Sequence, residues 1–70
     1  MIRSFTTANS SHVQRVEYGA GILRVEYRNG RIYTFSYVLP EVYEALVLAP
    51  SVGQFLNEFV YNQYDYTRIE

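Results

Sequence analysis

ILRVEYRNGRIYTFSY, from Ile22 to Tyr37, carries the clearest structural pattern in the sequence. Apolar and polar side chains alternate on both sides of Asn29-Gly30, a dipeptide typical of hairpin turns. The apolar members of the alternation are, in chain order, Leu23, Val25, Tyr27, Tyr33, Phe35 and Tyr37. A period of two residues is that of a half-buried antiparallel strand, so this stretch predicts a β-hairpin.

The phase of the alternation also favours one type of turn. A two-residue type I′ loop would pair Arg28 with Arg31 and put the two apolar sets on opposite faces. A three-residue loop, with Gly30 left-handed at a G1 bulge, shifts the pairing by one residue and brings both sets onto one face. We therefore predict the bulged turn, with the cross-strand pairs Tyr27 and Tyr33, Val25 and Phe35, and Leu23 and Tyr37.

The segment before the hairpin predicts one further strand. Val13 to Tyr18 is rich in β-prone residues but alternates imperfectly, and Gly19-Ala20-Gly21 then supplies a turn. We interpret it as an edge strand. Ser4 to Ser11 is polar, which predicts a flexible N-terminal arm over residues 1–10 and a single domain over residues 11–70.

Two helices are predicted after the hairpin. Pro40 suits a first helical turn, and the apolar spacing that follows predicts a helix ending near Pro50. Ser51 with Gln54 resembles a capping box, and a helical stripe then runs to about Asn62 over Val52, Phe55, Leu56, Phe59 and Val60. The fold class is therefore α+β, an antiparallel three-stranded β-meander covered by two short helices. The tail from Tyr64 to Ile69 alternates, as either a short terminal strand or an extended arm would.

The residue types argue against catalysis. The chain has no Cys and one histidine, His12, so neither a zinc site nor a Cys-His pair can be assembled, and we expect no metal and no cofactor. Asp65 is the only Asp, and the Glu residues fall on predicted surfaces, which gives paired-carboxylate chemistry little support. We expect a protein that is not an enzyme.

Size and charge limit the partners. A chain of 70 residues folds with a thin stability margin, and 17% aromatic residues make self-association a real option. A net charge of −1 makes strong non-specific DNA binding unfavourable. The sequence has no signal-peptide pattern and no apolar run near the roughly 18 residues of a membrane span, so we expect a cytoplasmic protein without a membrane partner.

Arginine near aromatic residues is the one pattern above background. In the bulged register, Arg24 and Arg28 project from the face opposite the aromatic set, where guanidinium groups could hold phosphate. Glu17 and Glu26 interleave with them, and opposite charges facing each other across strands are ordinary on a solvated sheet. The ordinary surface is the favoured interpretation of the two.

The ordered motifs resemble those of a known family. They are Ser10-Ser11-His12-Val13, Leu23-x-Val25-x-Tyr27, Tyr33-Thr34-Phe35, Val38 to Leu46, Ser51-x-Gly53-x-Phe55-Leu56-Asn57 and Tyr64-x-Tyr66-x-Arg68. Together they resemble the KTSC domain, named for the C-terminal domain of some lysyl-tRNA synthetases. The resemblance implies a small stand-alone bacterial or phage-type protein without known catalysis, and it suggests RNA binding. Two departures weaken that suggestion: Phe35 replaces a family tyrosine, and Tyr61-Asn62-Gln63 lacks the usual basic residues.

The function remains open between classes at this point. The first hypothesis is a binding module for RNA or a small nucleotide, and the second is a structural or protein-interaction module that forms a homo-oligomer. A variant of the first is a nucleotide-sequestering protein with an intersubunit pocket, in which Arg68 of one copy meets a phosphate held by another. The candidate binding residues are Ser11, Arg24, Arg28, Tyr33, Asn57, Tyr64 and Arg68.

Overall fold

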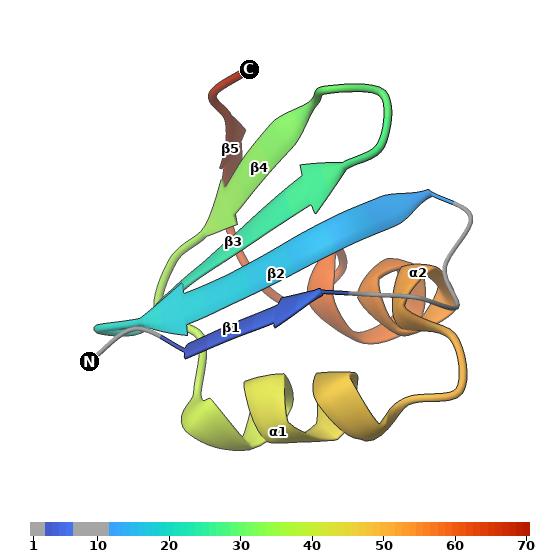
Figure 1. Cartoon of the computed structure of the whole chain (residues 1–70). Helices are drawn as coiled ribbons and strands as arrows, with labels where there is room; N and C mark the ends of the chain where they lie inside the picture. Colours follow the sequence, from blue (N-terminus) through green and yellow to red (C-terminus); the bar gives the residue numbers. More distant parts are fainter. Residues whose placement is uncertain (1–2, 7–11) are drawn as a thin grey trace.

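The computed structural model describes residues 3–6 and 12–70, which form one antiparallel sheet with helices on one of its faces (Figure 1). The strands lie in the order β1-β2-β3-β4-β5. Their bounds are β1 Arg3–Thr6, β2 Val13–Gly19, β3 Ile22–Tyr27, β4 Ile32–Phe35 and β5 Tyr66–Arg68. The helices are α1 Pro40–Leu48, α2 Val52–Phe55 and the π-helix η1 Leu56–Val60, which continues α2. The α+β class and the helical cover are confirmed, whereas the sheet has five strands instead of three.

The additional strands lie at the two edges of the sheet. β1 pairs with β2, with Arg3 opposite Tyr18, so the prediction that β2 is an edge strand was wrong. Four residues of the predicted flexible arm are therefore a strand, because a chain that follows the free edge of β2 satisfies its exposed backbone groups. The rest of that arm lies outside the described residues. β5 pairs with β4, so the C-terminal tail, for which either a strand or an extended arm was predicted, forms a strand.

The β3–β4 hairpin has the predicted kind of turn with a different register. Gly30 has a φ of +93°, and the Tyr27 N–H donates to the Arg31 carbonyl at 2.8 Å, which closes a three-residue loop. Leu23 lies opposite Phe35, and Val25 lies opposite Tyr33. The predicted pairs are thus displaced by two residues, which leaves both apolar sets on one face as predicted.

Tyr37 is the member of the predicted apolar set that leaves the sheet. Its φ of +58° turns the chain away after Ser36, and its side chain is 91% exposed. Val38 enters the core in its place, and its N–H donates to the Gly21 carbonyl at 2.9 Å. The alternation alone could not reveal this, because it continues past the residue at which the strand ends.

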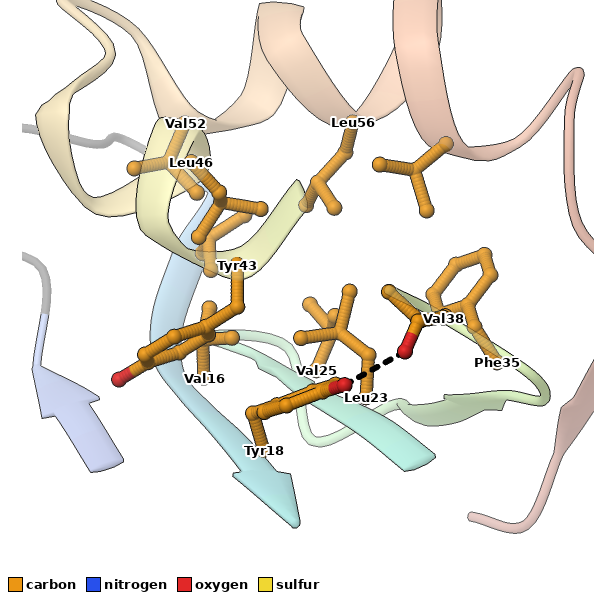
Figure 2. Packing of buried hydrophobic residues seen from close by; sticks show 12 residues of the cluster. Val16, Tyr18, Leu23, Val25, Phe35, Val38, Tyr43, Leu46, Val52 and Leu56 are labelled. Carbon is orange, nitrogen blue, oxygen red and sulfur yellow. Dashed lines mark hydrogen bonds between the residues drawn. The ribbon is translucent and has the colours of Figure 1, made fainter. Parts of the chain in front are cut away.

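Among the side chains that the structure describes, twelve buried apolar ones fill the space between the sheet and the helices (Figure 2). They are Val13, Val16, Tyr18, Leu23, Val25, Phe35, Val38, Tyr43, Leu46, Val52, Leu56 and Val60. The rings of Tyr18 from β2 and Tyr43 from α1 stack with centroids 5.4 Å apart, which joins the sheet to the first helix. The Tyr18 hydroxyl donates to the Val38 carbonyl at 2.5 Å, the contact drawn as a dashed line in Figure 2.

The two predicted helices begin where the sequence indicated. Pro40 occupies the first turn of α1, and the Ser51 hydroxyl accepts a hydrogen bond from the Gln54 backbone N–H at 3.3 Å. The Gln54 side chain donates to Glu58 at 3.1 Å, so only one half of the capping box forms. In the part of the chain that the structure describes, no helix is long and apolar enough to cross a membrane.

Removing the Tyr18 hydroxyl should test how the segment before α1 is joined to the sheet. Tyr18→Phe leaves a buried carbonyl of Val38 without its donor, so we expect the free energy of unfolding to fall by about 1–3 kcal/mol. Urea denaturation measures the change. Tyr37→Phe removes the same hydroxyl from an exposed ring and should cost less than about 0.5 kcal/mol. Equal losses in the two variants would contradict the assignment.

Candidate functional site

The open face of the sheet holds a charge cluster whose members bind one another. Nη1 of Arg24 lies 2.8 Å from Oε1 of Glu17 and 2.6 Å from Oε1 of Glu26. Nη2 of Arg15 lies 3.4 Å from Oε2 of Glu17. The hydrogen bonds that Arg24 donates to Glu26 and Glu17 raise the pKa of its guanidinium against the opposing effect of burial. Arg24 projects from the face opposite the aromatic set as predicted, but its guanidinium is already bound by two carboxylates.

The opposite face carries a cluster of tyrosines at the end of the sheet formed by β3, β4 and β5. The Tyr33 ring makes edge contacts with the rings of Tyr27, Tyr61 and Tyr66, at centroid separations of 5.6, 6.0 and 5.8 Å. The ring centroids of Tyr61 and Tyr66 are in turn 5.1 Å apart, and the Phe35 ring contacts both rings. We call Tyr27, Tyr33, Tyr61 and Tyr66 the tyrosine cluster.

A hydrogen bond between two phenols lies within the tyrosine cluster. The hydroxyls of Tyr27 and Tyr61 bind each other, and either can donate. Burial is the largest cause that raises the pKa of Tyr61, and the hydrogen bond with Tyr27 raises it further. Burial also raises the pKa of Tyr27. Both side chains are therefore neutral around neutral pH, and the pair supplies packing and a hydrogen bond instead of charge.

The π-helix η1 places Tyr61 against the sheet. The Tyr61 N–H donates to the Leu56 carbonyl at 2.9 Å, a five-residue step that widens the helix at its end. The predicted apolar stripe breaks at this turn. Phe59, a member of the stripe, is 54% exposed, whereas Tyr61, which is not a member, contacts the tyrosine cluster. Val60 is buried, as the stripe predicts. A strict helical period gives no signal for this change of phase.

β5 places an arginine beside the tyrosine cluster. Arg68 lies directly opposite Tyr33, so both side chains are on the helix-covered face of the sheet. Among the residues that the structure describes, the Arg68 guanidinium makes no ion pair or hydrogen bond. Tyr66, on the same face of β5, is 50% exposed. The edge of the sheet thus offers an accessible ring and a guanidinium that no carboxylate of the described chain neutralises.

A shallow open hollow adjoins this edge. It is lined by the chain from the end of the π-helix to the start of β5, namely Tyr61, Asn62, Gln63, Tyr64, Asp65 and Tyr66. Tyr64 is half-buried in its wall, whereas Asn62, Gln63 and Asp65 are exposed. The lining combines aromatic rings with amide and carboxylate groups, which suits a ligand with a flat ring and polar edges.

The predicted binding residues are only partly brought together. Tyr33, Tyr64 and Arg68 lie at the tyrosine cluster or the hollow beside it, whereas Arg24 lies on the open face. Arg28 lies in the β3–β4 turn, beyond the end of the strand in which it was predicted. Asn57 is exposed on the π-helix, and Ser11 lies outside the described residues.

Tyr61, Tyr66 and Arg31 were not among the candidate binding residues. Tyr66 had a signal, since it precedes Arg68 by two residues in an alternating tail and so shares its face. Arg31 precedes Tyr33 by two residues and falls on the same side by the same rule. For Tyr61 the sequence carried no such signal, because the π-helical turn sets the direction of its side chain. No group of three His, Cys, Asp or Glu residues within residues 3–6 and 12–70 could hold a metal ion.

The raised pKa values of Tyr27 and Tyr61 make stability depend on alkaline pH. A folded-state pKa above the unfolded value contributes stability that is present below about pH 10 and is lost as the pH rises further. We expect urea denaturation to show a falling free energy of unfolding above that pH. The double variant Tyr27→Phe/Tyr61→Phe removes both groups together and should show a shallower fall. A slope equal to that of the unmodified protein would contradict the assignment.

Comparison with known proteins agrees with this architecture. The crystal structure of a KTSC domain protein from Yersinia pestis superposes with a TM-score of 0.85 over 100% of each chain, at 18% sequence identity, which shows a shared fold. An uncharacterized protein of Stutzerimonas stutzeri (strain A1501) is 42% identical over 50 residues, which is 70% of each of the two chains. The family model of the KTSC domain matches residues 9–64. The chain therefore belongs to the KTSC domain family.

Proposed function

We propose that this protein is a non-enzymatic binding module that holds a short single-stranded RNA at the β4–β5 edge. The observation that supports this most strongly is the pairing of an accessible ring, Tyr66, with a guanidinium, Arg68, that has no carboxylate partner among the described residues. RNA is commonly bound by stacking unpaired bases on aromatic rings, with arginine close to the phosphates.

The base would stack on Tyr66. Its ring is held on its inner side by edge contacts with Tyr33 and Tyr61, so little side-chain entropy remains to be lost when a base covers the exposed side. Amide groups of Asn62 and Gln63 line the adjoining hollow and can donate to or accept from base edges.

The phosphate would contact Arg68, with Arg31 as a second cation on the same side. Both side chains are exposed, and neither has a hydrogen bond or ion pair from its side chain within the described chain. Few phosphates are contacted in this arrangement, and the net charge is −1, so binding should be weak and strongest at low salt.

The open face is a poorer site for the same ligand. Arg24 would have to give up Glu17 and Glu26 to bind a phosphate, and both carboxylates would then repel the phosphate. We place this role in the cytoplasm, where RNA is available and a chain without cysteine needs no oxidising compartment.

Fluorescence anisotropy with a labelled oligoribonucleotide at low salt tests the proposal. Tyr66→Leu keeps an apolar side chain but removes the stacking ring, so we expect affinity to fall roughly 5- to 150-fold, which corresponds to about 1–3 kcal/mol per stacked base. Arg68→Gln should weaken binding and reduce the dependence of log affinity on log salt by about 0.7.

Arg15→Gln provides the matched control, because it removes the same charge from the open face. Its affinity for the oligoribonucleotide should stay within about twofold of that of the unmodified protein. The reason is that solvent and salt screen the charge of a residue on the open face from a ligand at the β4–β5 edge. Loss of binding in Arg15→Gln with no effect of Arg68→Gln would move the site to the open face and refute the proposal. Failure of the unmodified protein to bind at low salt would refute RNA binding altogether.

A further inference from the structure

The outer edge of β5 presents backbone groups in a fixed pattern. The Ser36 N–H donates to the Asp65 carbonyl at 3.1 Å, and the Ile69 N–H donates to the Ile32 carbonyl at 2.8 Å. Because hydrogen-bonded positions alternate along a strand, Thr67 also directs its backbone groups toward β4. The N–H and C=O groups of Tyr66 and Arg68 consequently point away from the sheet, where no other described strand lies (Figure 1).

We propose that two copies of this chain join along β5, antiparallel, about a two-fold axis at Thr67. In this register Tyr66 lies opposite Arg68 of the partner subunit, and each such pair exchanges both of its outward backbone hydrogen bonds. The two sheets become one continuous sheet with the helices of both copies on the same face. The interface is isologous, as a two-fold axis requires.

The side chains at this edge complement a second copy in the same register. Directly opposed residues point to the same face, so the Tyr66 ring, 50% exposed, stands beside the partner's Arg68, and the symmetric pair repeats the contact. A register centred on Tyr66 forms fewer backbone bonds, and one centred on Arg68 sets two guanidinium groups against each other. A second copy therefore fits the edge better than an arbitrary extended peptide does.

The other edge of the sheet lacks this character. On β1, the Nη1 atom of Arg3 already lies 3.2 Å from Oε2 of Glu44, and its guanidinium lies 6.0 Å from the centre of the Tyr43 ring. Its charged side chain is thus satisfied within the chain. Among the edge strands that the structure describes, β5 alone combines an arginine without a partner and a half-exposed ring.

The dimer does not require RNA, but it would change the surface that RNA contacts. In the dimer, Tyr66 lies beside the partner's Arg68. A stacked base and its phosphate would then contact residues from both subunits. That consequence rests on the proposed RNA binding, whereas the pairing itself rests on the edge alone and is tested without RNA.

A disulfide at the symmetry axis tests the register. Thr67 and its symmetry mate form a non-hydrogen-bonded pair, whose Cα atoms lie about 4.5 Å apart, within the range that a disulfide spans. The chain has no native cysteine, so Thr67→Cys introduces a single thiol. Under mild oxidation we expect most of the chain to become a disulfide-linked dimer, seen by intact mass and by non-reducing electrophoresis.

Thr34→Cys is the matched control, because Thr34 lies directly opposite Thr67 on β4, one strand in from the edge. Its thiol should alkylate after unfolding but form no more than a trace of dimer in the folded protein. Equal cross-linking of the two variants would overturn the proposal, and so would a monomeric Thr67→Cys whose thiol alkylates readily in the folded protein. Neither result would touch RNA binding, which the anisotropy experiment decides separately.

Discussion

The register in which β3 pairs with β4 sets which side chains of the sheet can face the helices. With Leu23 opposite Phe35 and Val25 opposite Tyr33, the large apolar side chains at these four positions face the helices, whereas Ile22 on the other face of β3 is 41% exposed. A slip by one residue would turn one strand's apolar set into solvent and leave the helices without a surface to cover. Gly30 makes this pairing possible, because its φ of +93° closes the bulged loop at little steric cost.

The same pairing divides the charged residues between the faces. Arg24 is placed on the open face between Glu17 and Glu26, where the three side chains neutralise one another. β5 then adds Arg68 on the aromatic face, opposite Tyr33, at the sheet edge farthest from β1. Within the described residues, a guanidinium without a carboxylate partner, that of Arg68, thus lies beside a half-exposed tyrosine, Tyr66. Both proposals for this protein come from that arrangement.

The hairpin, both helix starts and the common face of the aromatic residues were predictable, because each depends on local chemistry: alternation, Asn29-Gly30, Pro40 and Ser51. The exact pairing was not, since registers that differ by two residues put the same side chains on the same face. The edge strand β1 was also missed, because its polar sequence resembles a loop and only the free edge of β2 makes it a strand. For the site, Arg68 and Tyr33 were predictable, whereas the direction of Tyr61 depends on a π-turn that leaves no periodic signal.

We propose that ligands bind this fold on its aromatic face at the β4–β5 edge. The most direct measurement is a titration of ¹⁵N-labelled protein with a short oligoribonucleotide, followed by backbone amide shifts in NMR spectra. We expect the largest shifts along Asn62 to Arg68 and at Tyr33, with little change along β2. Shifts centred on Glu17, Arg24 and Glu26 would contradict it, because they would show that the open face binds the ligand in spite of its ion pairs.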